Sequence, residues 1–170
     1  MQSIGIYKLH PTAQDPSLQT ENSACVDVYA YLKNKTIVTY DRYNSKSTST
    51  TDENTVGIRI GPRERILIPT GLIFDIPEHY SLRMHPRSGL SIKKGLILAN
   101  CEGVIDSDYV EELMIPVVNT SDISYDISHG ERIAQIELVR KEYFTYLHLR
   151  ERPEQKTDRS GGFGSTGVWT

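Results

Sequence analysis

Residues 65–84 read RILIPTGLIFDIPEHYSLRM. Three short runs of strand-forming residues follow one another in this stretch: Arg65–Ile68, Gly71–Ile76 and Tyr80–Met84. The turn signals Pro69-Thr70-Gly71 and Pro77-Glu78 separate them. None of the runs is long enough for a typical helix, so the stretch predicts consecutive short β-strands.

The same pattern continues on both sides of this stretch. Further strand-like runs occupy Ala24–Leu32, Thr36–Tyr40, Met114–Asn119 and Ile133–Leu138. The one helix that we expect is a short turn over Arg87–Lys94, because no segment keeps a 3.6-residue apolar period over a dozen residues. A chain of 170 residues fits one domain, and the pattern predicts an all-β barrel or sandwich.

Composition narrows the classes of function. Charged residues make up 24% of the chain and the net charge is −3, which gives no electrostatic reason to bind a long polyanion such as nucleic acid. The first 20 residues lack the apolar core of a secretory signal, and no run is long enough to span a membrane. We expect an intracellular protein whose two cysteines, Cys25 and Cys101, are buried free thiols.

Two segments hold residue types suited to a nucleotide. In His85–Leu90, the Arg87 guanidinium, the Ser88 hydroxyl and the Gly89 backbone could cradle a phosphate, although such a turn also occurs on ordinary surfaces. In Asn100–Tyr109, a tight hairpin could offer backbone groups to a base edge, beside a carboxylate that acts on water. The alternative is a loop whose aspartates cap turns and whose tyrosine packs.

The remaining polar features are more ambiguous. Asp27 interrupts an apolar strand pattern, and a buried carboxylate needs a partner, either a structural arginine or a hydrated metal ion. The tail of residues 152–167 is polar and then rich in glycine around Phe163, which suits either a disordered end or an arm that orders over a ligand. Asn44–Thr55 is polar and predicts a solvated loop or hairpin tip.

Taken in order, these segments resemble the five motifs of the trimeric dUTP diphosphatase (dUTPase) family. The motifs are Ala24-Cys-Val-Asp27, Pro86-Arg-Ser-Gly-Leu90, Gly103-Val-Ile-Asp-Ser-Asp-Tyr109, Gly130-Glu-Arg-Ile-Ala-Gln135, and Arg159 with Gly162-Phe-Gly-Ser-Thr-Gly167. The resemblance extends from about Lys8 to Gly167. It implies a jelly-roll-like β-barrel, or β-clip, at 1–151, with an inserted polar loop at about 44–55 and a flexible arm at 152–170.

The resemblance also implies a reaction, the hydrolysis of dUTP to dUMP and pyrophosphate. This reaction limits uracil incorporation into DNA and supplies dUMP for dTMP synthesis. Asp106 matches the catalytic aspartate that accepts a proton from the attacking water. Asp27 matches an aspartate that reaches Mg²⁺ through coordinated water, as suits an ion that loses its hydration shell reluctantly. The family assembles as homotrimers whose active sites combine residues from different subunits.

The implied substrate contacts fall into three groups. The uracil and deoxyribose pocket comprises Asn100, Gly103, Val104, Ile105, Tyr109 and Met114, and the phosphate contacts are Arg87, Ser88, Gly89 and Gln135. From the tail, Phe163 would stack on the base. Four further tail residues would close around the terminal phosphate: Arg159, Gly164, Ser165 and Thr166.

The chain departs from the family pattern at several positions. Cys25 stands where glycine is usual, and Val110-Glu111 follows Tyr109 in place of Arg-Gly. The spacing from Arg159 to Phe163 is one residue shorter than in many members, which affects the phosphate oxygen that Arg159 would reach.

Two other functions are compatible with this fold. A related deaminase acts on dCTP with a glutamate that aligns with Pro116 here, and proline cannot transfer a proton. A non-catalytic or additionally regulatory nucleotide-binding trimer is the other alternative, for which the polar segment Asn44–Thr55 is a candidate surface.

Overall fold

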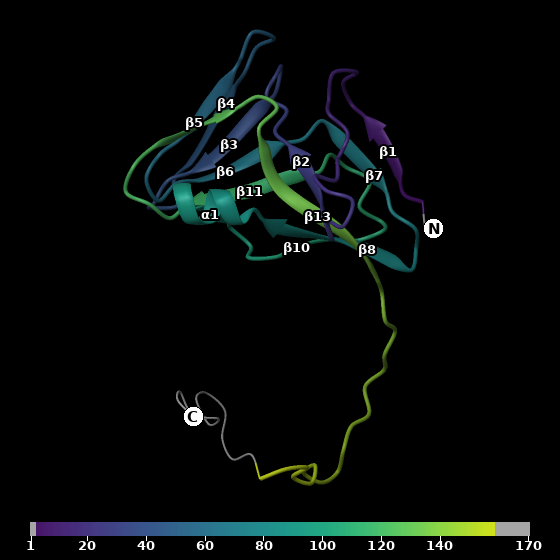
Figure 1. Cartoon of the computed structure of the whole chain (residues 1–170). Coiled ribbons are helices and arrows are strands. Elements are labelled where there is room, and N and C mark those ends of the chain that lie inside the picture. The colour runs from purple at the N-terminus through teal and green to yellow at the C-terminus, as the bar shows by residue number, and fades with distance from the viewer. Residues whose placement is uncertain (1–2, 159–170) are drawn as a thin grey trace.

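The computed structural model describes residues 3–158 of the chain, and the regular secondary structure in this part is β-strand except for one short helix (Figure 1). The elements in chain order are β1 Gly5–Lys8, β2 Val26–Tyr29, β3 Thr36–Tyr40, β4 Lys46–Thr50, β5 Gly57–Ile60, β6 Arg65–Pro69, β7 Leu72–Asp75, β8 Tyr80–Pro86, α1 Ser88–Lys94, β9 Leu96–Leu98, β10 Gly103–Ile105, β11 Met114–Asn119, β12 Tyr125–Ser128 and β13 Arg132–Arg140. Among residues 3–158, no helix has the length and apolar character needed to cross a membrane.

The strands form two main sheets and two ribbons. One sheet has the order β10-β8-β13-β2 and the other the order β4-β3-β6-β11-β9, while β1 pairs with β7 and β12 with β5. Every strand pairing is antiparallel. The predicted all-β, jelly-roll-like class is confirmed. Across residues 3–158 the sheets do not close into one continuous ring of hydrogen bonds, so this part of the chain is jelly-roll-like without being a closed barrel.

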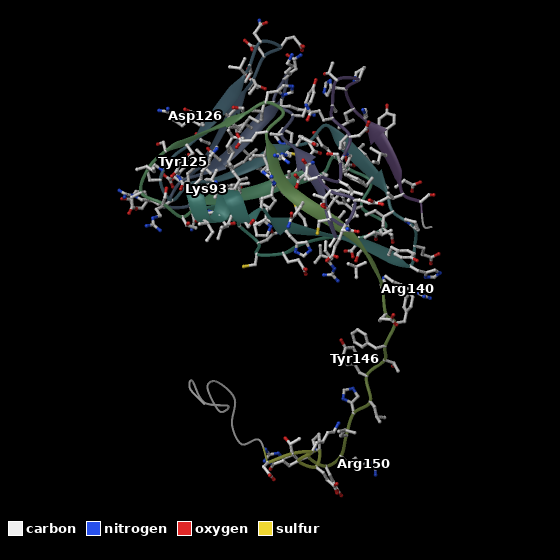
Figure 2. All side chains as sticks on the ribbon, in the orientation of Figure 1. Lys93, Tyr125, Asp126, Arg140, Tyr146 and Arg150 are labelled. Atoms are coloured by element: carbon white, nitrogen blue, oxygen red, sulfur yellow. The ribbon has the colours of Figure 1, made fainter. Side chains whose placement is uncertain are left out.

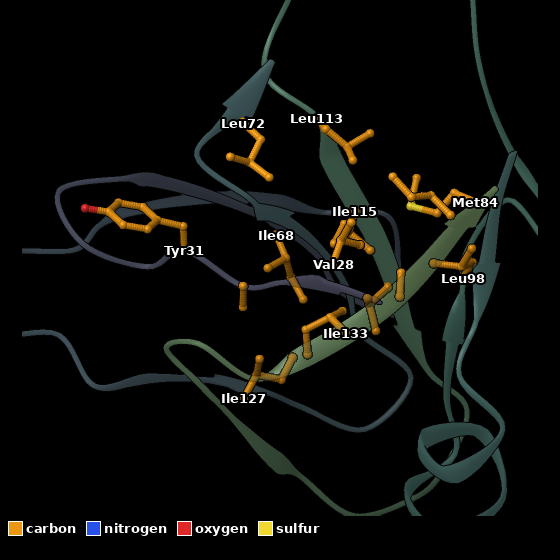
Figure 3. Close-up of a cluster of buried hydrophobic side chains, with 14 of the residues drawn as sticks. Val28, Tyr31, Ile68, Leu72, Met84, Leu98, Leu113, Ile115, Ile127 and Ile133 are labelled. Carbon is orange, nitrogen blue, oxygen red and sulfur yellow. The ribbon is translucent and has the colours of Figure 1, made fainter. Parts of the chain in front are cut away.

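The core lies between the two main sheets. Val28 and Ile133 from one sheet point toward Ile68 and Ile115 from the other (Figure 3). In β11 inward and outward residues alternate, with Ile115 and Val117 buried. This alternation of buried and outward residues is the pattern expected of a strand with one face in a core. The apolar residues by which the strands were predicted therefore also determine which face of each strand packs in the core and which faces solvent.

Several predicted boundaries agree with the structure. Thr36–Tyr40 and Met114–Asn119 are strands with the predicted limits, and the expected short helix is α1, preceded by Arg87. The polar segment Asn44–Thr55 contains β4, which pairs with β3 and has all five residues exposed, so it forms a solvated hairpin. The prediction that both cysteines are buried is wrong. Cys25 is half-buried, and Cys101 is exposed because it lies in the turn after β9, with a φ of 61°.

Beyond β13 the chain leaves the body of the protein. Residues 141–158 contain no helix or strand, and all of them are exposed. Tyr146 and Arg150 lie well away from the sheets (Figure 2). Five large apolar side chains are exposed along this segment: Tyr143, Phe144, Tyr146, Leu147 and Leu149. Such a run on an isolated chain indicates a surface that packs against something else.

Candidate active site

The segment Asn100–Tyr109 borders a pocket of about 420 Å³. The prediction that this segment is a tight hairpin is wrong, because its one strand, β10, pairs with β8. The pocket is lined by the six residues that sequence analysis placed at the nucleoside and by Asp106, the predicted catalytic aspartate; the six are Asn100, Gly103, Val104, Ile105, Tyr109 and Met114. Five more complete the wall: Leu67, Met84, Asp108, Leu113 and Pro116. Sequence analysis missed Leu67 and Met84, because they come from β6 and β8 and reach the pocket only through strand pairing.

The backbone of β10 is positioned by its pairing with β8. Gly103 lies opposite Met84, and a Cβ atom at Gly103 would lie 2.9 Å from the Met84 Cε atom and 3.1 Å from its Cβ atom. Because Gly103 has no side chain, β10 can pair with β8 at this position without a clash against the Met84 side chain. β10 is the edge strand of its sheet, so one side of its backbone is available to a ligand.

Two side chains flank the pocket after β10. The Tyr109 amide donates a hydrogen bond to the Asp106 carbonyl at 3.1 Å, and the Tyr109 hydroxyl donates to the Glu112 carbonyl at 3.0 Å. Burial, with Glu111 and Glu112 nearby, raises the pKa of Tyr109. Tyr109 is thus a neutral, oriented ring. The Asp106 side chain is exposed, and no other group in residues 3–158 forms a hydrogen bond or ion pair with its carboxylate.

A second pocket of about 380 Å³ brings motifs one, two and four together. All five predicted residues of this part line it: Asp27, Arg87, Ser88, Gly89 and Gln135. The remaining lining residues are Gln19, Ser23, Ala24, Cys25 and Arg132. The sequence motifs that predicted phosphate contacts are therefore gathered in space, although they lie up to about a hundred residues apart in the chain.

The junction of β8 and α1 forms the turn whose residues sequence analysis assigned to the phosphates. Pro86 ends β8, and Arg87 keeps an extended backbone as the residue before the helix. Ser88 and Gly89 are exposed at the start of α1, and Leu90 anchors it in the core. A Cβ atom at Gly89 would contact nothing within 4 Å among the described residues. Packing within the described part of the chain does not require this glycine, which leaves close approach of a ligand or a second subunit as its use.

Asp27 has two arginine partners. Its carboxylate is 5% exposed, with Oδ1 3.3 Å from Arg87 Nε and Oδ2 3.2 Å from Arg132 Nη1. Arg87 Nη1 also donates to the Arg132 carbonyl at 2.9 Å, and Arg132 donates to the Gln19 side chain. Sequence analysis left two possible partners for the buried Asp27 carboxylate, a structural arginine or a hydrated metal ion. The structure shows arginine side chains in contact with it. One buried carboxylate thus orients two cations at the rim of the pocket.

Arg132 is a site residue that sequence analysis did not single out. It lies inside motif four, where only Gln135 was assigned a role. The feature of the sequence that could have indicated it is a basic residue three positions before Gln135, in a motif assigned to phosphate binding. Cys25 also lines this pocket, and burial together with Glu137 and Asp27 raises the pKa of its thiol.

The two pockets have no lining residue in common. Within the described part of one chain, Asp106 and the turn at Arg87–Gly89 therefore line separate pockets. The five tail residues assigned to the ligand, Arg159, Phe163, Gly164, Ser165 and Thr166, lie outside the described residues.

The dUTPase family model matches residues 53–167 of this chain. The deoxyuridine 5'-triphosphate nucleotidohydrolase of Leptospira interrogans is 39% identical over 165 residues, covering 96% of this chain and 98% of that protein. The enzyme of the same name from Finegoldia magna is 51% identical over 111 residues, covering 65% and 76% of the two chains.

Solved structures agree in fold. The dUTPase of Staphylococcus bacteriophage 80alpha, with dUPNHPP, matches with a TM-score of 0.73 and 23% identity, over 99% of this chain and 100% of that one. A dUTPase mutant from phage phi11 of S. aureus, whose structure details a structural Mg(II) ion, has a TM-score of 0.68, 19% identity and coverage of 90% and 100%. The family model over residues 53–167 and the relative that matches 96% of the chain show the family, and the solved structures agree with its fold: this chain belongs to the dUTPase family.

Proposed function

We propose that this protein hydrolyses dUTP to dUMP and pyrophosphate. The observation that carries the proposal is the arrangement of the family motifs. The residues matched to the nucleoside line one pocket, and those matched to the phosphates line another, in a member of the dUTPase family. The relatives from Leptospira and Finegoldia are both named as nucleotidohydrolases of this nucleotide.

The pocket beside β10 suits a flat, small base. The free edge of β10 can present backbone N–H and C=O groups to the polar edge of uracil. A cytosine would present an amino group where uracil has an oxygen, and the unpaired buried group would oppose binding. The Tyr109 ring, held through its hydroxyl by the Glu112 carbonyl, would pack against the sugar and exclude a 2′-hydroxyl.

The phosphate pocket supplies positive charge and hydrogen-bond donors. Arg87, Ser88, Gly89 and Gln135 would bind the triphosphate, with Arg87 oriented by its ion pair to Asp27. Asp106 would accept a proton from a water molecule that attacks the α-phosphorus, and pyrophosphate would leave. A positioned general base accounts for about 10²–10⁴-fold of the rate. The free, exposed carboxylate of Asp106 suits that role.

A Mg²⁺ ion fits this reaction best as part of the substrate. Both oxygens of Asp27 already face arginine side chains, so this single carboxylate is a poor resident site for a divalent cation. A triphosphate carries Mg²⁺ on its own oxygens, because this ion binds phosphate and keeps several of its waters. We therefore assign the ion to the Mg²⁺–dUTP complex, and Asp27 to holding the arginines.

We propose that the working protein is a homotrimer. Because the two pockets share no lining residue, one chain does not bring Asp106 to the phosphate-binding turn, and a second copy would complete the site. The exposed apolar run of residues 143–149 offers a surface for packing between copies. The predicted domain at 1–151, of which residues 141–151 already lie outside the sheets, would then be completed by the arm at 152–170. In the arm, Phe163 would lie on the base, and Arg159, Gly164, Ser165 and Thr166 at the terminal phosphate.

The pocket wall disfavours deamination of dCTP. Pro116, the position that aligns with the deaminase glutamate, lines the nucleoside pocket. A proline side chain there has no titratable group with which to move a proton at the base. The protein would therefore lack the acid–base group that deamination needs at this wall.

Product analysis tests the proposed function. The full chain is incubated with Mg²⁺ and, separately, with dUTP, dCTP, dTTP and UTP. We expect dUMP and pyrophosphate from dUTP and negligible turnover of the other three. Asp106→Asn is the control for contaminating phosphatases. Equal hydrolysis of UTP, or formation of a deoxyuridine nucleotide from dCTP, would contradict the proposal.

A further inference from the structure

Three potential metal ligands meet on the outer face of the four-stranded sheet. The Cys25 sulfur, a His85 ring nitrogen and a Glu137 carboxylate oxygen all lie within 4.8 Å of one another. They come from the chain just before β2, from β8 and from β13, which lie side by side (Figure 1). Gln135 pairs with Asp27 on one side and His85 on the other, which places the ends of these strands in register.

The three donors match the preferences of one class of ion. A thiolate, an imidazole and a carboxylate are the protein ligands of Zn²⁺, with bond lengths of roughly 2.0–2.3 Å. Around a tetrahedral ion these lengths place the donors roughly 3.3–3.7 Å apart. The three donor atoms lie within 4.8 Å of one another, so binding of the ion would draw them closer together. Mg²⁺ would be rejected, because it prefers an octahedral set of oxygens.

The surroundings of His85 favour a metal ligand. Its Nε2 atom lies 3.0 Å from Glu137 Oε1, and its Nδ1 atom lies 3.9 Å from Glu102 Oε1. Glu102 is itself held by Arg83 at 3.2 Å. A ligating histidine commonly donates its second ring N–H to a carboxylate, which fixes the ring and increases its basicity. A small shift of the exposed Glu102 side chain would bring it within hydrogen-bond distance of Nδ1 when Nε2 binds an ion.

The cluster is also accessible. The side chains of His85 and Glu137 are 28% and 38% exposed, and Cys25 is half-buried, so an ion and a coordinated water can enter. We propose that Cys25, His85 and Glu137 bind one Zn²⁺ ion per chain, with the fourth coordination position open to solvent. The ion would tie three neighbouring strands together next to the phosphate pocket, whose wall includes Cys25. This inference does not depend on which nucleotide the protein hydrolyses.

Metal titration of the full chain tests the site without any activity measurement. The protein is stripped with a chelator under reducing conditions and titrated with Co²⁺. It is then titrated with Zn²⁺ in competition with a chromophoric chelator. We expect a sulfur-to-cobalt charge-transfer band at one equivalent, displacement of Co²⁺ by Zn²⁺, and no competition from excess Mg²⁺. Zinc should also raise the midpoint of thermal unfolding.

Variants assign the ligands. Cys25→Ser should remove the charge-transfer band, and Glu102→Gln, an outer partner, should weaken zinc binding by about 10–100-fold. Cys101→Ser is the matched control, because Cys101 is the other cysteine and is exposed. His85→Gln gives an independent loss of affinity should the serine variant fold poorly. An absent band in the parent protein, or a band that Cys101→Ser removes, would overturn the proposal. His85 and Glu137 would then be only a hydrogen-bonded pair.

Discussion

Replacing Asp27 by asparagine separates a structural role from a metal-binding role. The substitution keeps the shape of the side chain and removes the charge that faces Arg87 at 3.3 Å and Arg132 at 3.2 Å. Hydrogen bonds that involve charged groups contribute about 1.5–3 kcal/mol each when they are buried. The two arginine side chains are 24% and 40% exposed, and solvent screening lowers these values.

We therefore expect the unfolding free energy of Asp27→Asn to fall by about 1–3 kcal/mol in total. For a domain of this size each 1 kcal/mol corresponds to about 2–4 °C in the unfolding midpoint, so Tm should fall by about 2–12 °C. The loss should appear in buffer without Mg²⁺ or nucleotide, because both contacts lie within the chain. Release of Arg87 from its anchor should also lower kcat/KM by about 10–100-fold.

The assay is thermal and urea unfolding of the parent and the variant, with and without Mg²⁺. Asp126→Asn is the matched control. It removes an aspartate–arginine pair of similar length, with Arg59, but on a surface where both partners are more than half exposed. We expect no measurable change for this control. The reasoning fails if Asp27→Asn unfolds like the parent without Mg²⁺ and has lost a Mg²⁺-dependent stabilisation that the parent shows.

The other predictions concern the two pockets and the arm. Asp106→Asn should still bind a non-hydrolysable dUTP analogue and lose turnover by about 10²–10⁴-fold or more, measured by pyrophosphate release. Turnover within a few-fold of the parent would exclude Asp106 as the base. Mixing Asp106→Asn chains with Phe163→Ala chains should restore part of the activity after verified subunit exchange, because some mixed sites combine intact contributions; no recovery would argue against sites shared between chains. Removal of residues 158–170 should leave a stable assembly with a reduced kcat, because an arm that closes over the ligand excludes water; an unchanged kcat would show that the arm has no part in catalysis. Gly103→Ala should cost about 1–3 kcal/mol, because its Cβ atom would lie 3.1 Å from that of Met84, and should weaken analogue binding in calorimetry. Unchanged stability and affinity would refute the close-packing argument for this glycine.

The parts of the fold predicted from sequence are those encoded by local patterns. Thr36–Tyr40 and Met114–Asn119 are rich in branched apolar residues, and they form strands with the predicted bounds. The exposed strand β4 and the three-residue strands β9 and β10 were not predicted as separate strands. They carry little or no alternation of their own and exist because a neighbouring strand supplies their hydrogen bonds.

The same distinction applies to the site. The nucleoside pocket could be predicted because Asn100–Tyr109 is one continuous segment, and contiguous residues stay near one another in any fold. The hairpin predicted for it could not form within the segment, because its strand β10 pairs with the distant strand β8. The partners of Asp27 could not be predicted, because Arg132 lies 105 residues away and meets it only through the register of β2 and β13. That register also brings Cys25, His85 and Glu137 together.

The sequence alone therefore determined the class of fold, the motifs and the residue types at the two pockets. The tertiary structure decided which distant charges meet, and that the pockets have separate walls within the described chain. The physical reason is strand register. Side-chain patterns specify which face of a strand is buried, whereas the cross-strand neighbours depend on an alignment that moves every contact when it shifts by one residue.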